Sequence, residues 1–281
     1  MDMSIYDRIK DKFIMKNAWE DWASYRSQLT ELILEHDPES VIIIGAGRCN
    51  DIDLFTLLSG GKKVICVDVD VASMRTSMER LPDNLRSRIE CKNISLTGIS
   101  EKDMEVFCDR MLSSARDKGQ DISMDYLRSE MLLNLEALQK KLIQSEEAIL
   151  RYLPEKSADT VVCCGVHSQL FSTLSFFIKS MLGSLYDIIP EVTGLEAEAD
   201  RIIRDMNNSI IPIINNALIR AAGRYIIFGN EYSSQSPVEG AEQCIRNVRE
   251  NMNPFERHLR WDFNSWEGVI YDMLIQECIL S

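Results

Sequence analysis

The stretch IIIGAGRCNDIDL at residues 42–54 constrains the fold of this chain more than any other part of its sequence. It continues VIII at 41–44, a run of β-branched residues typical of a strand that is buried on both faces of a parallel sheet. Gly45 and Gly47 follow directly and allow a tight turn and the close approach of a ligand to the backbone. Because open α/β sheets bind ligands outside the carboxyl ends of their strands, this stretch predicts a ligand site at that edge.

A second buried strand is predicted in VICVDVD at 64–70, and Asp68 stands at its carboxyl end. A carboxylate in this position can accept hydrogen bonds from both ribose hydroxyls of an adenosine ligand. The combination of a glycine turn with this acid is more specific than the glycine turn alone. The alternative is a purely structural turn followed by a helix cap.

The residues after the glycines bear on which adenosine ligand is bound. A dinucleotide fingerprint needs a third glycine where this chain has Asn50. A pyrophosphate also prefers a helix N-terminus free of acids, whereas Asp51 and Asp53 stand at this one. Carboxylates suit a cationic sulfonium with an amino-acid tail, so the pattern favours S-adenosylmethionine over a nicotinamide dinucleotide. The structural alternative is that Asn50 or Asp51 caps the helix and that Asp53 is a first-turn acid.

Further strands predict the architecture. They are expected at 88–96, 157–166 and 223–232, while 257–263 and 269–280 are expected to be closing strands or a strand and a helix. Strands that alternate with helices indicate a doubly wound, mostly parallel α/β sheet.

The chain length of 281 residues would allow two domains, but we expect a single domain over residues 1–281. Helices are predicted within 1–39. Helical insertions at 97–153 and 171–222 are expected to cover the ligand pocket.

The helical segment 122–153 carries apolar residues at intervals of three and four. This spacing can form a coiled-coil seam, through which the chain would assemble as a homo-oligomer. The favoured alternative is an amphipathic helix that packs on its own domain.

Charge and cysteine usage limit the classes of partner. The 31 Lys and Arg against 44 Asp and Glu give a net charge of −13, which repels a polyphosphate, so we expect a small-molecule substrate and no nucleic acid. The N-terminal sequence has no apolar signal-like run, and we expect no membrane partner. Eight cysteines without a CxxC pair, beside three histidines, disfavour a zinc site, and we expect no metal. Scattered cysteines of this kind favour a reducing, cytoplasmic setting.

Taken together, IIIGAGRCNDIDL, VDVD at 67–70, PEKSADTVVCCGVHSQL at 154–170 and GRYIIFGNE at 223–231 resemble the class I S-adenosylmethionine-dependent methyltransferases. The resemblance covers less than half of the chain and implies a Rossmann-like methyltransferase sheet. The chain departs from the family pattern at Ile43, where an acid is usual, and at Cys49, where a third glycine is usual. An adenine-contacting acid after the third strand is also replaced, by Asn93 or Ser95.

The resemblance assigns roles to individual residues. Gly45, Ala46 and Gly47 would line the methionine part of the cofactor, and Asp68 with the neighbouring Val69 would lie at its ribose. Asp51 or Asp53 would lie near its amino end, beside Asn50. The segment from Asn93 to Ser95 would face adenine, and the segment from Gly165 to His167 would border the transferred methyl group.

His167 follows the fourth predicted strand, where the reacting groups of such a fold meet. A histidine can take a proton near neutral pH, so His167 is the candidate catalytic base. The alternative is a loop histidine whose hydrogen bonds are satisfied by backbone.

The predicted function is S-adenosylmethionine-dependent methyl transfer to an oxygen or nitrogen of a small molecule. One alternative is a methyltransferase-like binding or scaffold protein without catalysis, which the changes at Ile43 and Cys49 favour. Another is an NAD(P)-linked oxidoreductase, which Asn50 disfavours. The sequence does not identify the methyl acceptor, because specificity would lie in the insertions.

Overall fold

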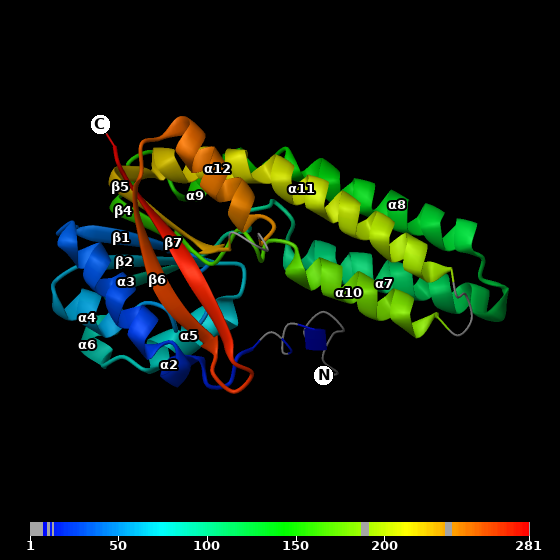
Figure 1. Ribbon diagram of the computed structural model, residues 1–281, viewed down its shortest axis with the longest axis horizontal. Helices are drawn as coiled ribbons and strands as arrows, with labels where there is room; N and C mark the ends of the chain where they lie inside the picture. The colour runs from blue at the N-terminus through cyan, green and yellow to red at the C-terminus, as the bar shows by residue number, and fades with distance from the viewer. Residues whose placement is uncertain (1–7, 10–11, 13, 187–190, 234–237, 281) are drawn as a thin grey trace.

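A seven-stranded sheet organises one half of the molecule in the computed structural model, which describes residues 8, 9, 12, 14–186, 191–233 and 238–280. The strand order is β3-β2-β1-β4-β5-β7-β6 (Figure 1). The pairs among β1 to β5 are parallel, whereas β7 is antiparallel to both β5 and β6. The strands are β1 (Ser40–Ile44), β2 (Lys63–Asp68), β3 (Ile89–Asn93), β4 (Ala158–Cys164), β5 (Ala222–Tyr232), β6 (Phe255–Asn264) and β7 (Val269–Ile279).

Helices cover both faces of this sheet. One face packs against α3 (Ala23–Glu35), α4 (Leu54–Ser59) and α5 (Val71–Glu79), and the short α2 (Ala18–Asp21) and α6 (Asp83–Arg86) lie on that side. The other face packs against α9 (Ser145–Tyr152), α11 (Val192–Ala221) and α12 (Ala241–Asn251). The β-branched run of β1 is therefore buried on both sides, as its sequence predicts.

The predicted fold class, a doubly wound and mostly parallel α/β sheet with helical insertions, is confirmed. The two segments predicted at the C-terminus are both strands, so the alternative of a strand and a helix is wrong. The predicted N-terminal helices within 1–39 are α2 and α3, and residues 1–7, 10, 11 and 13 lie outside the described residues.

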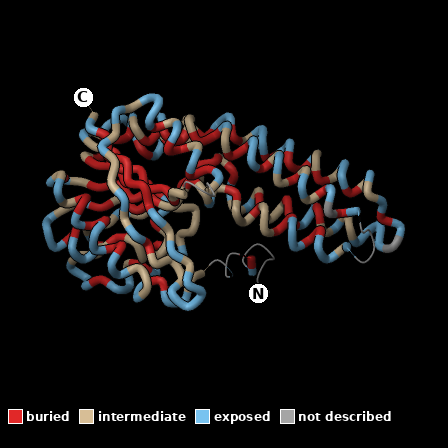
Figure 2. The backbone as a smooth tube through the Cα atoms, viewed as in Figure 1, coloured by how far each residue is buried: buried red, intermediate tan, exposed pale blue. Residues whose placement is uncertain are grey.

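The insertions form a helical arm made of α7 (Glu101–Lys118), α8 (Met124–Leu142), α10 (Ser172–Ser184) and the first part of α11. A short 3-10 turn, η1 (Gly119–Asp121), joins α7 to α8. These helices pack around one another and extend away from the sheet, so that the base of the arm faces the carboxyl edge (Figure 1). Figure 2 shows the buried residues along the sheet and along the inner sides of the arm helices.

The predicted helical segment 122–153 is two helices, because α8 ends at Leu142 and α9 begins at Ser145. The apolar face of α8, formed by Leu127, Met131, Leu135, Leu138 and Leu142, is buried within the chain itself. The alternative of an amphipathic helix that packs on its own chain therefore describes this face. Assembly into a homo-oligomer stays a prediction, and it would need another surface.

Among the helices of the described part of the chain, none is both long enough and apolar enough to cross a membrane.

Candidate functional site

Two adjoining cavities lie at the carboxyl edge of the sheet and share Gly45, Asp68, Gly165, Gln169 and Thr173. The first, which we call the apolar cavity, measures about 250 Å³ and lies against the base of the arm. The second, which we call the loop cavity, measures about 290 Å³ and lies against the glycine loop at residues 45–51. The two cavities meet at the carboxylate that the sequence singles out.

The glycine loop needs its first two glycines for different reasons. Gly45 has φ +67°, and a Cβ atom there would lie 2.4 Å from Cγ2 of Val166, so the loop runs against the residue that follows β4. Gly47 has φ +45° and turns its N–H toward Asp68. Cys49, which stands where the methyltransferase pattern has a third glycine, also has a positive φ of +47°. The backbone therefore keeps the left-handed turn although the glycine is missing.

Asp68 links the loop to β2. Its Oδ2 accepts a hydrogen bond of 2.8 Å from the N–H of Gly47, and its Oδ1 accepts one of 2.7 Å from the N–H of Asp70. Burial raises the pKa of this carboxyl, and the backbone hydrogen bonds oppose that rise. A carboxylate has about four acceptor positions, so each oxygen can still accept a hydroxyl group of a ligand.

Two arginines, Arg26 and Arg80, donate hydrogen bonds to the glycine loop. Arg26 of α3 donates hydrogen bonds of 2.8 Å to the backbone oxygens of Trp19 and Asn50. Arg80 donates one of 3.0 Å to Oδ1 of Asn50 and another to the backbone oxygen of Arg48. The ring of Trp19 lies 3.6 Å from the Arg26 guanidinium and 4.0 Å from that of Arg80. These contacts fix the loop, and one of them occupies the side-chain oxygen of Asn50.

Charged groups of both signs line the loop cavity. Burial raises the pKa of Asp51 to about 6, although the positive charge of Arg26 opposes the rise. Arg48 lines the same cavity, and its Nε has no hydrogen-bond partner among the described residues. The cavity can therefore receive a ligand that carries an anionic and a cationic group.

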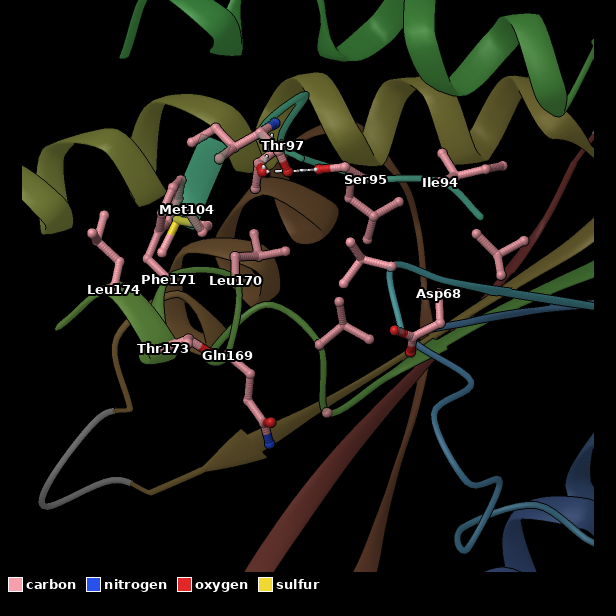
Figure 3. Close-up of a pocket in the computed structure, with 17 residues that line it drawn as sticks. Asp68, Ile94, Ser95, Thr97, Met104, Gln169, Leu170, Phe171, Thr173 and Leu174 are labelled. Atoms are coloured by element: carbon pink, nitrogen blue, oxygen red, sulfur yellow. Dashed lines mark hydrogen bonds between the residues drawn. The ribbon is translucent and has the colours of Figure 1, made fainter. Parts of the chain in front are cut away.

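The apolar cavity has a different character. Figure 3 shows the Asp68 carboxylate at one side of it and Met104, Phe171 and Leu174 at the opposite side. Ser95 lines it as well, and its hydroxyl donates a hydrogen bond of 2.6 Å to the backbone oxygen of Ile99. Most other wall residues are apolar: Val67, Val69, Ile94, Leu96, Ile99, Val166 and Leu170. A largely apolar group would suit this space.

His167 does not lie on either cavity. Its side chain is buried on the α11 side of the sheet, where Nε2 lies 2.8 Å from Oδ1 of Asn215. Burial lowers the pKa of His167 to about 4. The neighbouring Gly165 and Val166 do line the cavities, so the segment is well placed although the histidine side chain is not.

The structure brings most predicted ligand-binding residues together. Nine of them line the cavities: Gly45, Ala46, Gly47, Asn50, Asp51, Asp68, Val69, Ser95 and Gly165. Asn93 is exposed instead, and its side chain donates a hydrogen bond of 3.3 Å to the backbone oxygen of Val69. The wall residues Arg48, Thr173 and Trp261 were not predicted from the sequence. Arg48 could have been found, because it stands inside the loop, whereas Trp261 comes from a distant segment without a motif.

No protein-family model matches the chain, and no curated protein matches its sequence. Some solved structures are similar to this chain at low identity. The methyltransferase domain of bacterial CtHen1 is 11% identical, with 91% of this chain and 97% of that chain covered and a TM-score of 0.43. Magnesium protoporphyrin IX methyltransferase from Synechocystis PCC 6803, with SAM bound, is 10% identical, with 98% and 88% covered and a TM-score of 0.45. At these identities and TM-scores, neither likeness carries a conclusion about this chain.

Proposed function

We propose that this chain is an S-adenosylmethionine-dependent methyltransferase that methylates an oxygen or nitrogen atom of a small molecule. The observation that carries the proposal is the place of Asp68, between an apolar cavity and a cavity with charges of both signs. An adenosine ligand with an amino-acid tail has the same sequence of chemical groups: a flat base, a ribose diol, and an amino and carboxylate end. The resemblance of the glycine loop to the methyltransferase family supports the same ligand.

The polar and charged side chains of the site suit this cofactor. In the proposal, adenine lies in the apolar cavity beside Val69 and Ser95, and Asp68 accepts the ribose hydroxyls. Arg48, whose Nε lacks a partner among the described residues, binds the carboxylate. Asp51 binds the amino group, and this contact would lower the raised pKa of Asp51.

The bound cofactor would supply a methyl group on a positively charged sulfur. The chain would contribute mainly orientation, because Asp68 and the glycine loop fix one end of the site and Gly165 borders the reacting atoms. Trp22 and Trp261 line the loop cavity and would exclude water from it. His167 is not part of this proposal, since it lies outside both cavities and burial disfavours its protonated form.

A second candidate function is ligand binding without catalysis. Among the described residues that line the cavities, the ionisable side chains are Arg48, Asp51, Asp68 and Asp70 and the thiols of Cys49 and Cys164. No histidine or lysine stands in that set to take the proton that an alcohol or ammonium acceptor must release. A sensor or scaffold would need only the binding site.

A calorimetric titration with S-adenosylmethionine tests the proposal. The wild-type chain should bind it, and Asp68→Asn should weaken binding about tenfold or more, because a charge-assisted hydrogen bond to the ribose is lost. The matched control is Asp53→Asn. Asp53 caps α4 by accepting a hydrogen bond from the N–H of Thr56 and lines neither cavity, and asparagine can also cap a helix.

Each alternative has its own result in this experiment. Absence of binding at millimolar cofactor, with the chain folded, would contradict the proposal. Binding without methyl transfer to a panel of small alcohols, phenols, amines and carboxylates would favour the ligand-binding protein. Stronger thermal stabilisation by a nicotinamide dinucleotide than by S-adenosylmethionine would favour an oxidoreductase.

A further inference from the structure

Three cysteines from separate segments meet on one face of the sheet, next to the glycine loop. Cys49 belongs to that loop, Cys66 to β2 and Cys91 to β3. Cys49 and Cys66 lie in one buried cluster against which Cys91 packs, and the Cys91 thiol donates a hydrogen bond of 3.3 Å to Sδ of Met78. All eight cysteines lie in the described part of the chain, and each is a free thiol. Cys49 lines the loop cavity, whereas Cys66 and Cys91 line neither cavity.

The backbone positions of Cys66 and Cys91 suit a disulfide bond. These residues are register partners on neighbouring parallel strands, so their side chains point to the same face. Partners in adjacent strands lie about 4.8 Å apart. Cα atoms joined by a disulfide lie roughly 4.4–6.8 Å apart, which this spacing meets. Their Cβ atoms lie roughly 3.5–4.5 Å apart, so β2 and β3 would have to approach each other slightly at this point.

Cys91 is the accessible member of the cluster. Cys49 and Cys66 are buried, whereas Cys91 is half-buried on β3, the strand at the edge of the sheet. The hydrogen bond from Cys66 lowers the pKa of Cys91 to about 7, and the positive charge of Arg75 acts in the same direction. Cys91 therefore has the features of a reactive thiol: thiolate character near neutral pH, access to solvent and a second thiol alongside.

We propose that Cys91 and Cys66 are a redox-modification site that a peroxide converts reversibly into a disulfide between β2 and β3. The Cys91 thiolate attacks one oxygen of hydrogen peroxide, the O–O bond breaks, and the hydroxide that leaves takes a proton from solvent to form water. The Cys66 thiol then attacks the sulfenic acid at Cys91, and the S–S bond forms as a second water leaves. In total, two thiols lose two electrons and peroxide is reduced to two water molecules.

The new bond would join the two strands two residues before Asp68. It would also remove the free thiol of Cys66, which packs in the same cluster as Cys49 of the glycine loop. The site is separate from the proposed methyl transfer, because its formation requires peroxide and these thiols alone. Failure of one proposal therefore leaves the other intact.

The purified full chain, treated with equimolar hydrogen peroxide and then alkylated, tests this site by mass spectrometry of a non-reduced digest. The expected result is a cross-linked peptide that joins Cys66 to Cys91 and disappears after reduction. The rate of its formation should rise about tenfold between pH 6 and pH 8, because the thiolate fraction of a thiol with a pKa near 7 rises by about that factor.

Two variants provide the comparison. Cys91→Ala should form no cross-link at Cys66. Cys108→Ala should form it at the wild-type rate, because Cys108 is a buried thiol of α7 whose pKa burial raises to about 12. The proposal is overturned if Cys91 bonds to a different cysteine, if it accumulates as sulfinic acid while Cys66 stays reduced, or if it does not react. A rate that is flat with pH would also overturn it.

Discussion

In the sheet half of the molecule, two partly buried carboxylates lie at the carboxyl edge, whereas the helical arm pairs its charged side chains at the surface. Asp51 and Asp68 are partly buried at the carboxyl ends of the strands, where burial raises the pKa of each. The arm instead fills its interior with side chains such as Phe107, Met111 and Leu135. Its ion pairs, for example Arg128 with Glu198 at 2.8 Å, lie at the surface.

We infer that the carboxylates of the sheet half serve ligand binding, whereas the apolar interior of the arm serves its stability. Desolvated carboxylates destabilise the folded state near neutral pH, and they persist most readily where a ligand makes use of them. The arm has the composition of a packed helical bundle, and it meets the site only at its base, through Met104, Phe171 and Leu174. Substitutions in the sheet half should therefore affect ligand binding and pH dependence, and those in the arm should affect mainly the arm.

The largest change in the free energy of unfolding is expected from Leu135→Lys in the arm. Leu135 is 1% exposed, so a lysine there would bury a charge without a partner and should cost more than about 4 kcal/mol. Hydrogen exchange should show lost protection in α7 and α8, with β1 and β4 still protected. Leu133→Lys, at a position of α8 that is 62% exposed, should change stability by less than about 0.5 kcal/mol. If the Leu135→Lys variant kept native protection against hydrogen exchange in every helix and strand, the contrast between the arm and the sheet half would be contradicted.

The next largest change in stability is expected at Gly45, and Gly183 provides the comparison. Gly45→Ala should lower the free energy of unfolding by about 2–4 kcal/mol and abolish ligand binding, because a Cβ atom is strained at φ +67° and collides with Val166. Gly183→Ala in α10 has open space around its Cβ position and should stabilise the chain by up to about 1 kcal/mol. Chemical denaturation of both variants measures the difference. Equal effects at the two positions would contradict it.

His167 should govern part of the acid sensitivity. Its pKa is about 4 in the folded chain, below the usual value of 6.5, so the unfolded chain binds the proton more tightly. The resulting stability is present above pH 6.5, is lost as the pH falls toward 4, and amounts to a loss of about 2 kcal/mol by pH 5. His167→Gln should lack this loss while binding the ligand normally. The control His258→Gln, at an exposed position, should retain the loss. Weaker ligand binding by His167→Gln would restore His167 to the site.

The smallest effect is expected from Asp51→Asn. Because burial raises the pKa of Asp51 to about 6, the folded chain favours its neutral form, and this stability is lost as the pH rises through 6. The neutral asparagine should therefore stabilise the chain by about 1–2 kcal/mol at pH 7.5 and hardly at pH 4. The variant should also bind S-adenosylmethionine more weakly. Thermal unfolding at pH 7.5 and pH 4 measures the gain in stability, with Asp53→Asn as the reference. An equal gain in stability at the two pH values would contradict a raised pKa at Asp51.

The sequence could predict the parts of the site that are local. Gly45, Gly47 and Asp68 follow adjacent strands of a parallel sheet, and the strand order alone brings them together. Side-chain direction at a strand end is less predictable. His167 comes two residues after Gly165, yet it turns to the α11 side of the sheet and hydrogen-bonds to Asn215.

Contacts over long sequence separations could not be predicted at all. Arg26 and Arg80 hold the glycine loop from α3 and from the end of α5, and neither belongs to a motif. The extension of the arm away from the sheet also depends on how several helices pack together. Periodicity gives the apolar face of α8, but it does not tell whether that face meets the same chain or another copy.

A crystal soaked with S-adenosylhomocysteine tests the proposed binding mode. We expect density for adenine in the apolar cavity, for the ribose hydroxyls within hydrogen-bonding distance of Asp68, and for the amino-acid end beside Arg48 and Asp51. Density that places the ligand away from Asp68, or cavities without ligand density at saturating concentration, would contradict it.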